Sequence, residues 1–186
     1  MTYLLDTMIV SFFLQADRER ELAAVAKHCP VAIVDEVRRE LKNDRDRGGD
    51  LFEKWIATSN IEVRSIVVGS PASTTLADLL NPASLNKGRG ERASIALAAS
   101  DTSLTFVTHD KAAVWIAMRE LWTRGERALG LFAFLRRLFD EGALADPVVI
   151  DDVMGAVGAA TQRPTWWAPW RAGIASSASG AAPPPV

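Results

Sequence analysis

The sequence predicts an α/β protein with three layers, α/β/α, built around a central sheet that is mainly parallel. Short apolar runs alternate along the chain with longer segments in which apolar residues recur at helical spacing. Hydrophobic residues make up 48% and charged residues 24% of the 186 residues, which is the balance of a globular chain rather than a disordered one. The longest apolar stretches fall far short of the roughly 20 residues that a membrane helix needs.

Four short apolar runs are the expected strands. The first, residues 3–5, ends at Asp6. The second, residues 31–34, is rich in β-branched side chains, as in a buried strand. Residues 61–68 alternate imperfectly and form the third expected strand, and residues 104–107 form the fourth.

The expected helices have apolar side chains on one face and polar or small side chains on the other. Proline and glycine mark several of their ends, as at Pro30 and Gly142. The expected helices are residues 8–14, 17–28, a segment that starts at Asp35 and ends before Gly48, 51–56, a segment between Pro71 and Pro82, 91–100, 114–121 and 131–139. Alternation of strands and helices of this kind indicates parallel pairing.

The length predicts one domain with a C-terminal extension. We assign residues 1–148 to the domain, 149–171 to a C-terminal helix and Trp-rich segment, and 172–186 to a flexible tail. Thirteen of the last 15 residues are Ala, Gly, Ser or Pro, so we expect the tail to be dispensable for folding. The tryptophans of residues 166–170 are expected to pack on protein, either this domain or a partner; stacking on nucleic-acid bases is the alternative.

Charge and cysteine content exclude several classes of protein. With 21 basic and 23 acidic residues the net charge is −2, which argues against a surface that grips nucleic acid everywhere and leaves room for a local basic patch. One cysteine, Cys29, excludes an intrachain disulfide and a multi-cysteine zinc site. The N-terminal residues show no targeting pattern, so we expect a cytoplasmic protein that does not enter a membrane.

Four carboxylates are expected near the carboxyl ends of the strands, where the functional sites of parallel α/β proteins lie. Asp6 and Asp110 follow the first and fourth expected strands, Glu91 begins a helix after a glycine loop, and Glu40 lies in the helix after the second strand. Carboxylates crowded together repel one another unless a cation neutralises them. Hard cations such as Mg²⁺ prefer such oxygen ligands and can activate a water for phosphodiester hydrolysis.

Each acid also has an ordinary structural explanation. Asp6 and Asp110 could simply cap helices, and Glu91 could be a first-turn glutamate that complements the helix dipole. Glu40 stands among basic residues and could belong to a solvated helix face. Glu36 lies one helical turn earlier on the same side and is the rival of Glu40.

Four segments, taken in order, resemble the motifs of the PIN-domain family, which includes the ribonuclease toxins of VapC-type toxin–antitoxin pairs. Residues 4–9 (Leu-Leu-Asp-Thr-Met-Ile) resemble the strand that leads into Asp-Thr, and residues 34–41 resemble the helix that ends in Glu-Leu. Residues 90–98 resemble the helix that begins with Gly-Glu, and residues 106–110 resemble the strand that ends in Thr-x-Asp. The resemblance covers roughly residues 1–145.

The resemblance implies a PIN-like fold and a metal-dependent endoribonuclease, with RNA as substrate and Mg²⁺ or Mn²⁺ as cofactor. It implies that one set of residues is catalytic and binds the metal: Asp6, Glu40, Glu91 and Asp110. Thr7 would lie beside these ligands. His109 stands where the family more often has asparagine, and no further acid follows Asp110, so one metal ion is the expectation. An antitoxin protein and a second copy of the chain are the implied partners.

Three cations flank Glu91 in sequence, namely Lys87, Arg89 and Arg92. They are candidates to bind the RNA backbone, since phosphate contacts supply most of the affinity for nucleic acid; a solvated loop is the alternative. His109 could position a phosphate or a water, or could be a loop residue without a chemical role.

Two other functions compete with the nuclease. The chain could be a catalytically inactive PIN-like module that binds RNA or protein. The presence of all four acids argues against this function, since a binding module has no need for carboxylates that repel one another. It could also be a phosphatase with an aspartyl nucleophile, but Met8 stands where that chemistry usually needs a second aspartate.

Overall fold

The computed structural model describes residues 1–43, 49–80, 88–122, 127–158 and 163–178, and its strands form one five-stranded sheet in which every pairing is parallel. The strands are β1 (Thr2–Leu5), β2 (Val31–Val34), β3 (Glu62–Arg64), β4 (Leu104–Thr108) and β5 (Ala128–Gly130). Their order in the sheet is β3-β2-β1-β4-β5. Strands β1 and β4 lie at its centre, with Leu5 paired to Val107. The two strands that carry Asp6 and Asp110 at their ends are therefore neighbours.

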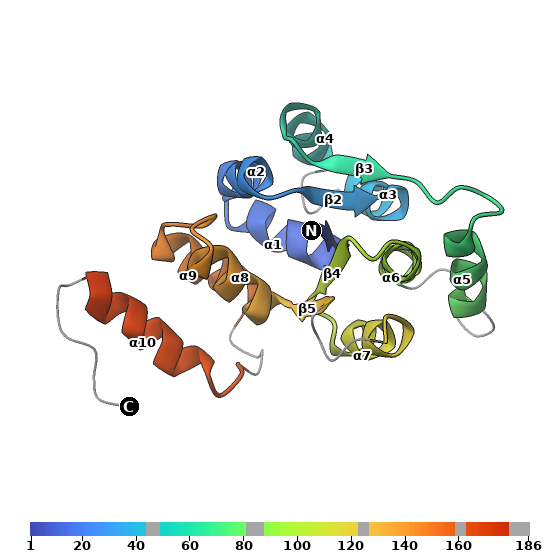
Figure 1. The fold of residues 1–186 in the computed structure, drawn as a ribbon. Coiled ribbons are helices and arrows are strands. Elements are labelled where there is room, and N and C mark those ends of the chain that lie inside the picture. Colours follow the sequence, from blue (N-terminus) through green and yellow to red (C-terminus); the bar gives the residue numbers. More distant parts are fainter. Residues whose placement is uncertain (44–48, 81–87, 123–126, 159–162, 179–186) are drawn as a thin grey trace.

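Helices flank the sheet and complete the three layers that the sequence predicts (Figure 1). The described helices are α1 (Thr7–Gln15), α2 (Glu19–His28), α3 (Asp35–Asn43), α4 (Gly49–Thr58), α5 (Pro71–Leu80), α6 (Arg89–Ser100), α7 (Lys111–Glu120), α8 (Leu131–Asp140), α9 (Pro147–Val157) and α10 (Trp167–Ala178). Helix α6 packs against α3, α5 and α7, and Figure 1 shows α6 and α7 on the opposite side of the strands from α8 and α9. The predicted α/β fold class is confirmed.

Apolar residues predominate in the central strands, and threonine occupies their remaining positions. Every residue of β2 and β4 is buried, as expected for parallel strands covered by helices on both faces. Helix starts follow local chemistry: Asp6, Asp110 and Asp146 each accept a hydrogen bond from a backbone N–H in the first turn of the helix that follows. Asp6 and Asp110 therefore do cap helices, and this role is compatible with a second one.

The structure corrects the prediction for the third strand. Residues 61–68 were expected to be extended, but β3 is only Glu62–Arg64. Its last residue pairs with Val34, where β2 ends, so residues beyond Arg64 have no strand to pair with. Val67 and Val68 are 70% and 94% exposed and lie outside the sheet. The prediction also missed β5, whose three residues are too few to show alternation.

The C-terminal segment differs from the expected tail. Helix α10 continues to Ala178, so residues 172–178 are helical, which is compatible with their content of alanine and with the absence of proline from residues 170–182. The expected boundary at residue 148 falls inside α9, which packs on α1 and adds Val149 and Ile150 to the hydrophobic core. Among the residues that the structure describes, no helix has the length and apolar character to cross a bilayer.

Candidate functional site

Asp6 and Asp110 meet at the carboxyl edge of the sheet through one hydroxyl group. The Thr108 hydroxyl donates a hydrogen bond to Oδ2 of Asp6 and accepts one from the Asp110 backbone N–H at 3.1 Å. Asp6 Oδ1 accepts from the Ile9 N–H at 2.9 Å, and Asp110 Oδ1 accepts from the first turn of α7. Thr108, which ends β4, therefore links the Asp6 carboxylate to the backbone of Asp110.

Glu40 reaches the same edge from α3. Its Oε1 accepts from the Gly90 N–H at 2.9 Å, and its Oε2 accepts from the hydroxyl of Thr7, the residue after Asp6. The contact depends on glycine, because a Cβ atom at Gly90 would lie 2.9–3.0 Å from both Glu40 oxygens and 3.0 Å from Val37 Cγ2. Glycine at this position lets α6 approach α3 closely enough for the Gly90 amide to hold the Glu40 carboxylate.

Glu36, the rival of Glu40, is not part of this hydrogen-bond network in the described structure. One of its oxygens accepts from Arg39 at 3.3 Å, and the other is buried without a hydrogen-bond partner. Glu40, by contrast, is bonded to the residue that follows Asp6 and to the residue that precedes Glu91. The geometry favours Glu40 as the member of the carboxylate cluster.

Glu91 lies close enough to the other three acids to be influenced by their charges. Its pKa is raised from 4.5 to about 7, first by burial and then by the charges of Asp6, Asp110 and Glu40, with Arg92 opposing the shift. Its carboxylate folds toward Gly88, where a Cβ atom would lie 2.7 Å from Glu91 Oε2. Gly88 has a φ of 67°, a left-handed conformation that glycine adopts without strain.

The Asp6 carboxyl is the most deeply buried of the four. Asp6 is 1% exposed, and this burial raises its pKa from 3.8 to about 6 although Thr108 and the α1 amides stabilise the charged form. The charge of Asp110 adds to the rise. Two of the four acids thus carry negative charge that the surrounding protein does not fully compensate.

These four residues, which we call the carboxylate cluster (Asp6, Glu40, Glu91 and Asp110), fit a hard divalent cation in their chemistry. All four donors are carboxylate oxygens, the ligands that Mg²⁺ and Mn²⁺ prefer, and the uncompensated charge favours a cation. In the part of the chain that the structure describes, however, no three His, Cys, Asp or Glu side chains already lie in a metal-binding arrangement. Asp6 and Glu40 are instead held by hydrogen bonds from Thr108, Thr7 and backbone amides.

The remaining predicted residues occupy mixed positions. Thr7 binds Glu40 and supports the cluster, whereas the His109 ring packs edge-on against Phe12 at 5.3 Å, and burial lowers its pKa. Arg92 lies close enough to Glu91 to lower its pKa. Arg89 is exposed at the first residue of α6, and Lys87 lies outside the described residues.

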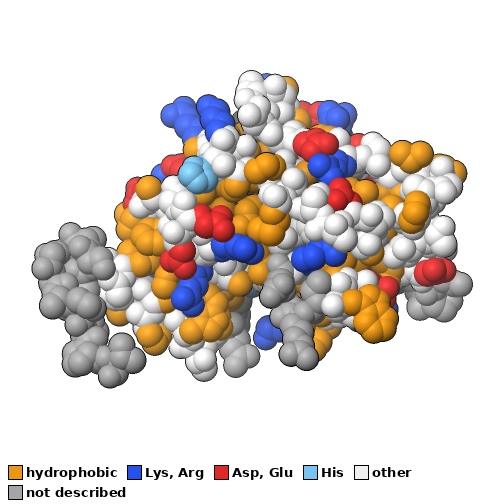
Figure 2. All heavy atoms as spheres, viewed as in Figure 1, with side chains coloured by type: hydrophobic (Ala, Val, Ile, Leu, Met, Phe, Trp, Pro, Cys, Tyr) orange, Lys and Arg blue, Asp and Glu red, His pale blue; other side chains and the backbone are white. Residues whose placement is uncertain are grey.

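The sequence prediction missed two groups that hold the cluster together. Thr108 enters the sequence prediction only within the Thr-x-Asp motif, and the Gly90 backbone N–H has no part in it. A threonine that ends a buried strand two residues before an aspartate could have signalled the first group, since a buried hydroxyl needs a partner. Figure 2 shows acidic and basic side chains interspersed over the described part of the visible face, in line with the small net charge.

No protein-family model matches the sequence, and no curated protein or solved structure matches it either. The resemblance to the PIN-domain family therefore rests on the four motifs and stays a hypothesis.

Proposed function

We propose that the chain is a divalent-cation-dependent endoribonuclease that hydrolyses RNA phosphodiester bonds. One observation carries the proposal: four acids from separate segments of the sequence lie near the carboxyl edge of the sheet, where Thr7, the Gly90 amide and Thr108 hold Glu40 and Asp6, and where the charges of the other three acids raise the pKa of Glu91. Acids brought together in this way repel one another and reduce the stability of the fold. A bound cation would offset this repulsion, and cation binding is the most direct function for such a cluster.

In the proposed reaction the carboxylate cluster would hold Mg²⁺ or Mn²⁺. The cation, when bound, lowers the pKa of a coordinated water and neutralises charge that develops on the phosphate. Thr108 and the Ile9 amide orient the Asp6 carboxylate, and Thr7 and the Gly90 amide orient that of Glu40. Such fixed orientation reduces the reorganisation needed when substrate arrives.

The partners belong to the same proposal. RNA is the substrate, and an antitoxin protein and a second copy of the chain are the protein partners that the resemblance implies. An RNA substrate favours the cytoplasm as the site of action, where the half-buried Cys29 stays reduced.

A cleavage assay tests this function. The full chain should cut single-stranded or loop RNA with Mg²⁺ or Mn²⁺ and stop when EDTA is added. Asp6→Asn should abolish cleavage, because it removes one charge from the cluster and keeps the side-chain size. Asp146→Asn is the matched control, since Asp146 caps α9 at an exposed site and should leave cleavage unchanged. Wild-type cleavage that persists in EDTA would refute the proposal.

A second candidate is a PIN-like module that binds RNA or protein without turnover. It is favoured by the lack, among the described residues, of a preformed set of three metal ligands. This candidate predicts that the chain binds RNA and leaves it intact at every Mg²⁺ or Mn²⁺ concentration.

A further inference from the structure

A groove of about 540 Å³ lies next to the carboxylate cluster and is lined by residues outside it. Its walls come from α7, from the start of α8, and from residues 163–166 ahead of α10. Aromatic side chains contribute much of the lining, namely His109, Trp115, Phe132 and Trp166. Part of this wall comes from the C-terminal extension, beyond the roughly 145 residues that resemble the PIN-domain family.

The groove adjoins the cluster at Asp110. Both His109 and Lys111 line it, and Asp110 stands between them in the chain. Strands β4 and β5 end at Thr108 and Gly130, and Gly130 also lines the groove, so the groove opens at the same edge of the sheet as the acids. A ligand that occupies the groove and extends beyond His109 therefore reaches the carboxylate cluster.

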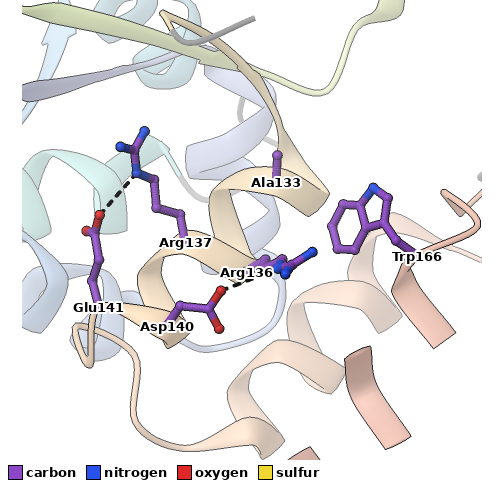
Figure 3. A pocket seen from close by; sticks show the side chains of 6 residues that line it. All are labelled: Ala133, Arg136, Arg137, Asp140, Glu141 and Trp166. Atoms are coloured by element: carbon purple, nitrogen blue, oxygen red, sulfur yellow. Dashed lines mark hydrogen bonds and ion pairs between the residues drawn. The ribbon is translucent and has the colours of Figure 1, made fainter. Parts of the chain in front are cut away.

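Phe132 and Trp166 are held by ring contacts at the groove, and Trp115 presents an exposed face to it. Trp115 is 70% exposed, which is a large apolar surface for a side chain in a helix of a globular protein. Phe132 packs edge-on against the buried Trp167, with ring centroids 5.0 Å apart. Figure 3 draws a neighbouring pocket that shares Ala133 and Trp166 with the groove, and it shows Arg136 extending from α8 toward the Trp166 ring; the Arg136 guanidinium carbon lies 5.2 Å from the ring centroid.

Positive charge accompanies the aromatic surface. Lys111 and Arg163 both line the groove, both are exposed, and neither forms an ion pair with another described residue. Helix α8 also begins at the groove, and its N-cap, Gly130, offers no side chain to its first amides. The positive end of the helix dipole thus adds to the two cations.

We propose that this groove binds an unpaired nucleobase of single-stranded RNA, with Lys111 and Arg163 contacting the flanking phosphates. The inference rests on the proposed function and specifies its substrate class, since a base in a duplex could not enter between aromatic side chains. Aromatic side chains beside cations are the recurring chemistry of single-strand binding, because every base offers a face for stacking. An apolar peptide is the competing occupant; two cations without ion-pair partners in the described structure favour a polyanion over it.

Binding to a short fluorescein-labelled single-stranded oligoribonucleotide tests the proposal, measured by anisotropy with the full chain in EDTA. Trp115→Ala should weaken binding about tenfold, and Trp115→Phe should restore most of it, because phenylalanine still offers a face for stacking. Trp122→Ala is the matched control, since Trp122 is 95% exposed and lies outside the groove. An abasic oligomer of the same length should bind wild type weakly and should not distinguish the Trp115 variants.

A second variant tests the phosphate contact separately from stacking. Arg163→Gln should weaken binding and reduce the slope of log affinity against log salt by about 0.7, the value for one phosphate contact on a single strand. Trp115 and Arg163 are both exposed, so the far-UV circular dichroism and the thermal midpoint of their variants should match those of wild type.

The outcomes separate this proposal from the nuclease. RNA binding that depends on Trp115 without any cleavage in Mn²⁺ would support the groove and overturn the nuclease. Cleavage by wild type, with Trp115→Ala binding RNA as tightly as wild type, would overturn the groove and leave the nuclease standing. If the oligoribonucleotide does not bind and Trp115→Ala changes the oligomeric state by light scattering, the groove is a protein interface and the proposal is wrong.

Discussion

Asp6→Asn should stabilise the protein at pH 8 in EDTA, although Asp6 caps a helix. Burial raises the pKa of Asp6 from 3.8 to about 6. Since a tenfold change in proton affinity corresponds to about 1.4 kcal/mol, ionising this carboxyl at high pH costs the folded state ~3 kcal/mol relative to the unfolded chain. Asparagine carries no charge and avoids this cost, and its Oδ1 can still accept from the Ile9 amide.

The gain should appear only across a defined pH range. Below about pH 3.8 the carboxyl is protonated in both states, so wild type has no penalty for the variant to remove. As the pH rises from there to about 6, the unfolded chain releases this proton and the folded chain retains it, and wild type loses stability over that range. Above about pH 6 the penalty is complete and constant.

The loss of the hydrogen bond that Thr108 donates to the Asp6 carboxyl offsets part of the gain, by about 1–2 kcal/mol. We therefore expect the variant to be about 1–2 kcal/mol more stable than wild type at pH 8 and about 1–2 kcal/mol less stable near pH 3.5, where only the lost hydrogen bond counts. Urea unfolding of both proteins in EDTA measures the difference. Asp146→Asn, at an exposed cap, should change the free energy of unfolding by about 0.5 kcal/mol or less at either pH. An Asp6→Asn protein destabilised equally at both pH values would refute the reasoning.

Three further predictions concern the packing and charge of the site. Gly90→Ala should lower the free energy of unfolding by about 1–3 kcal/mol, because the new Cβ would crowd the Glu40 carboxylate. Gly155→Ala, with open space around residue 155, should raise the free energy of unfolding by about 0.5–1 kcal/mol. Thermal or urea unfolding measures both changes. Trp167→Ala should cost about 3 kcal/mol because Trp167 is 3% exposed, while Trp122→Ala, 95% exposed, should stay within about 0.5 kcal/mol in the same assay. Mn²⁺ affinity should rise from pH 5.5 to 8 as the two acids with raised pKa lose their protons, and calorimetry in buffers of different ionisation enthalpy should detect proton release; affinity independent of pH would contradict the charge assignment.

Local sequence patterns predicted most of the fold because most strands and helices carry a clear apolar run or an apolar stripe. The strand of residues 31–34 is one apolar run buried on both faces, and the helix around Leu131 has a continuous apolar stripe. Strand β5 and the shortening of β3 depend on where the partner strand begins and ends, which single-sequence periodicity does not contain. The helical residues 172–178 were missed because a composition of small residues is shared by tails and helices.

The candidate site could be predicted as a set of acids but not as a geometry. Asp6 and Asp110 follow strands, so their position at one edge of the sheet follows from parallel topology. The choice between Glu36 and Glu40 required the structure, because it depends on a close approach of two helices at Gly90. The groove at Trp115 required it as well, since residues 163–166 are distant in sequence from α7.

The central claim is that the carboxylate cluster binds a divalent cation, and electron paramagnetic resonance of free Mn²⁺ tests it most directly. Titration of the full chain should show one tightly bound Mn²⁺ per chain at pH 7.5. Asp110→Asn should remove that binding while keeping the cap on α7, since asparagine oxygen can accept the same amide hydrogen bonds. Wild type that binds no Mn²⁺ at millimolar concentration, or an Asp110→Asn protein that binds it as tightly as wild type, would contradict the account.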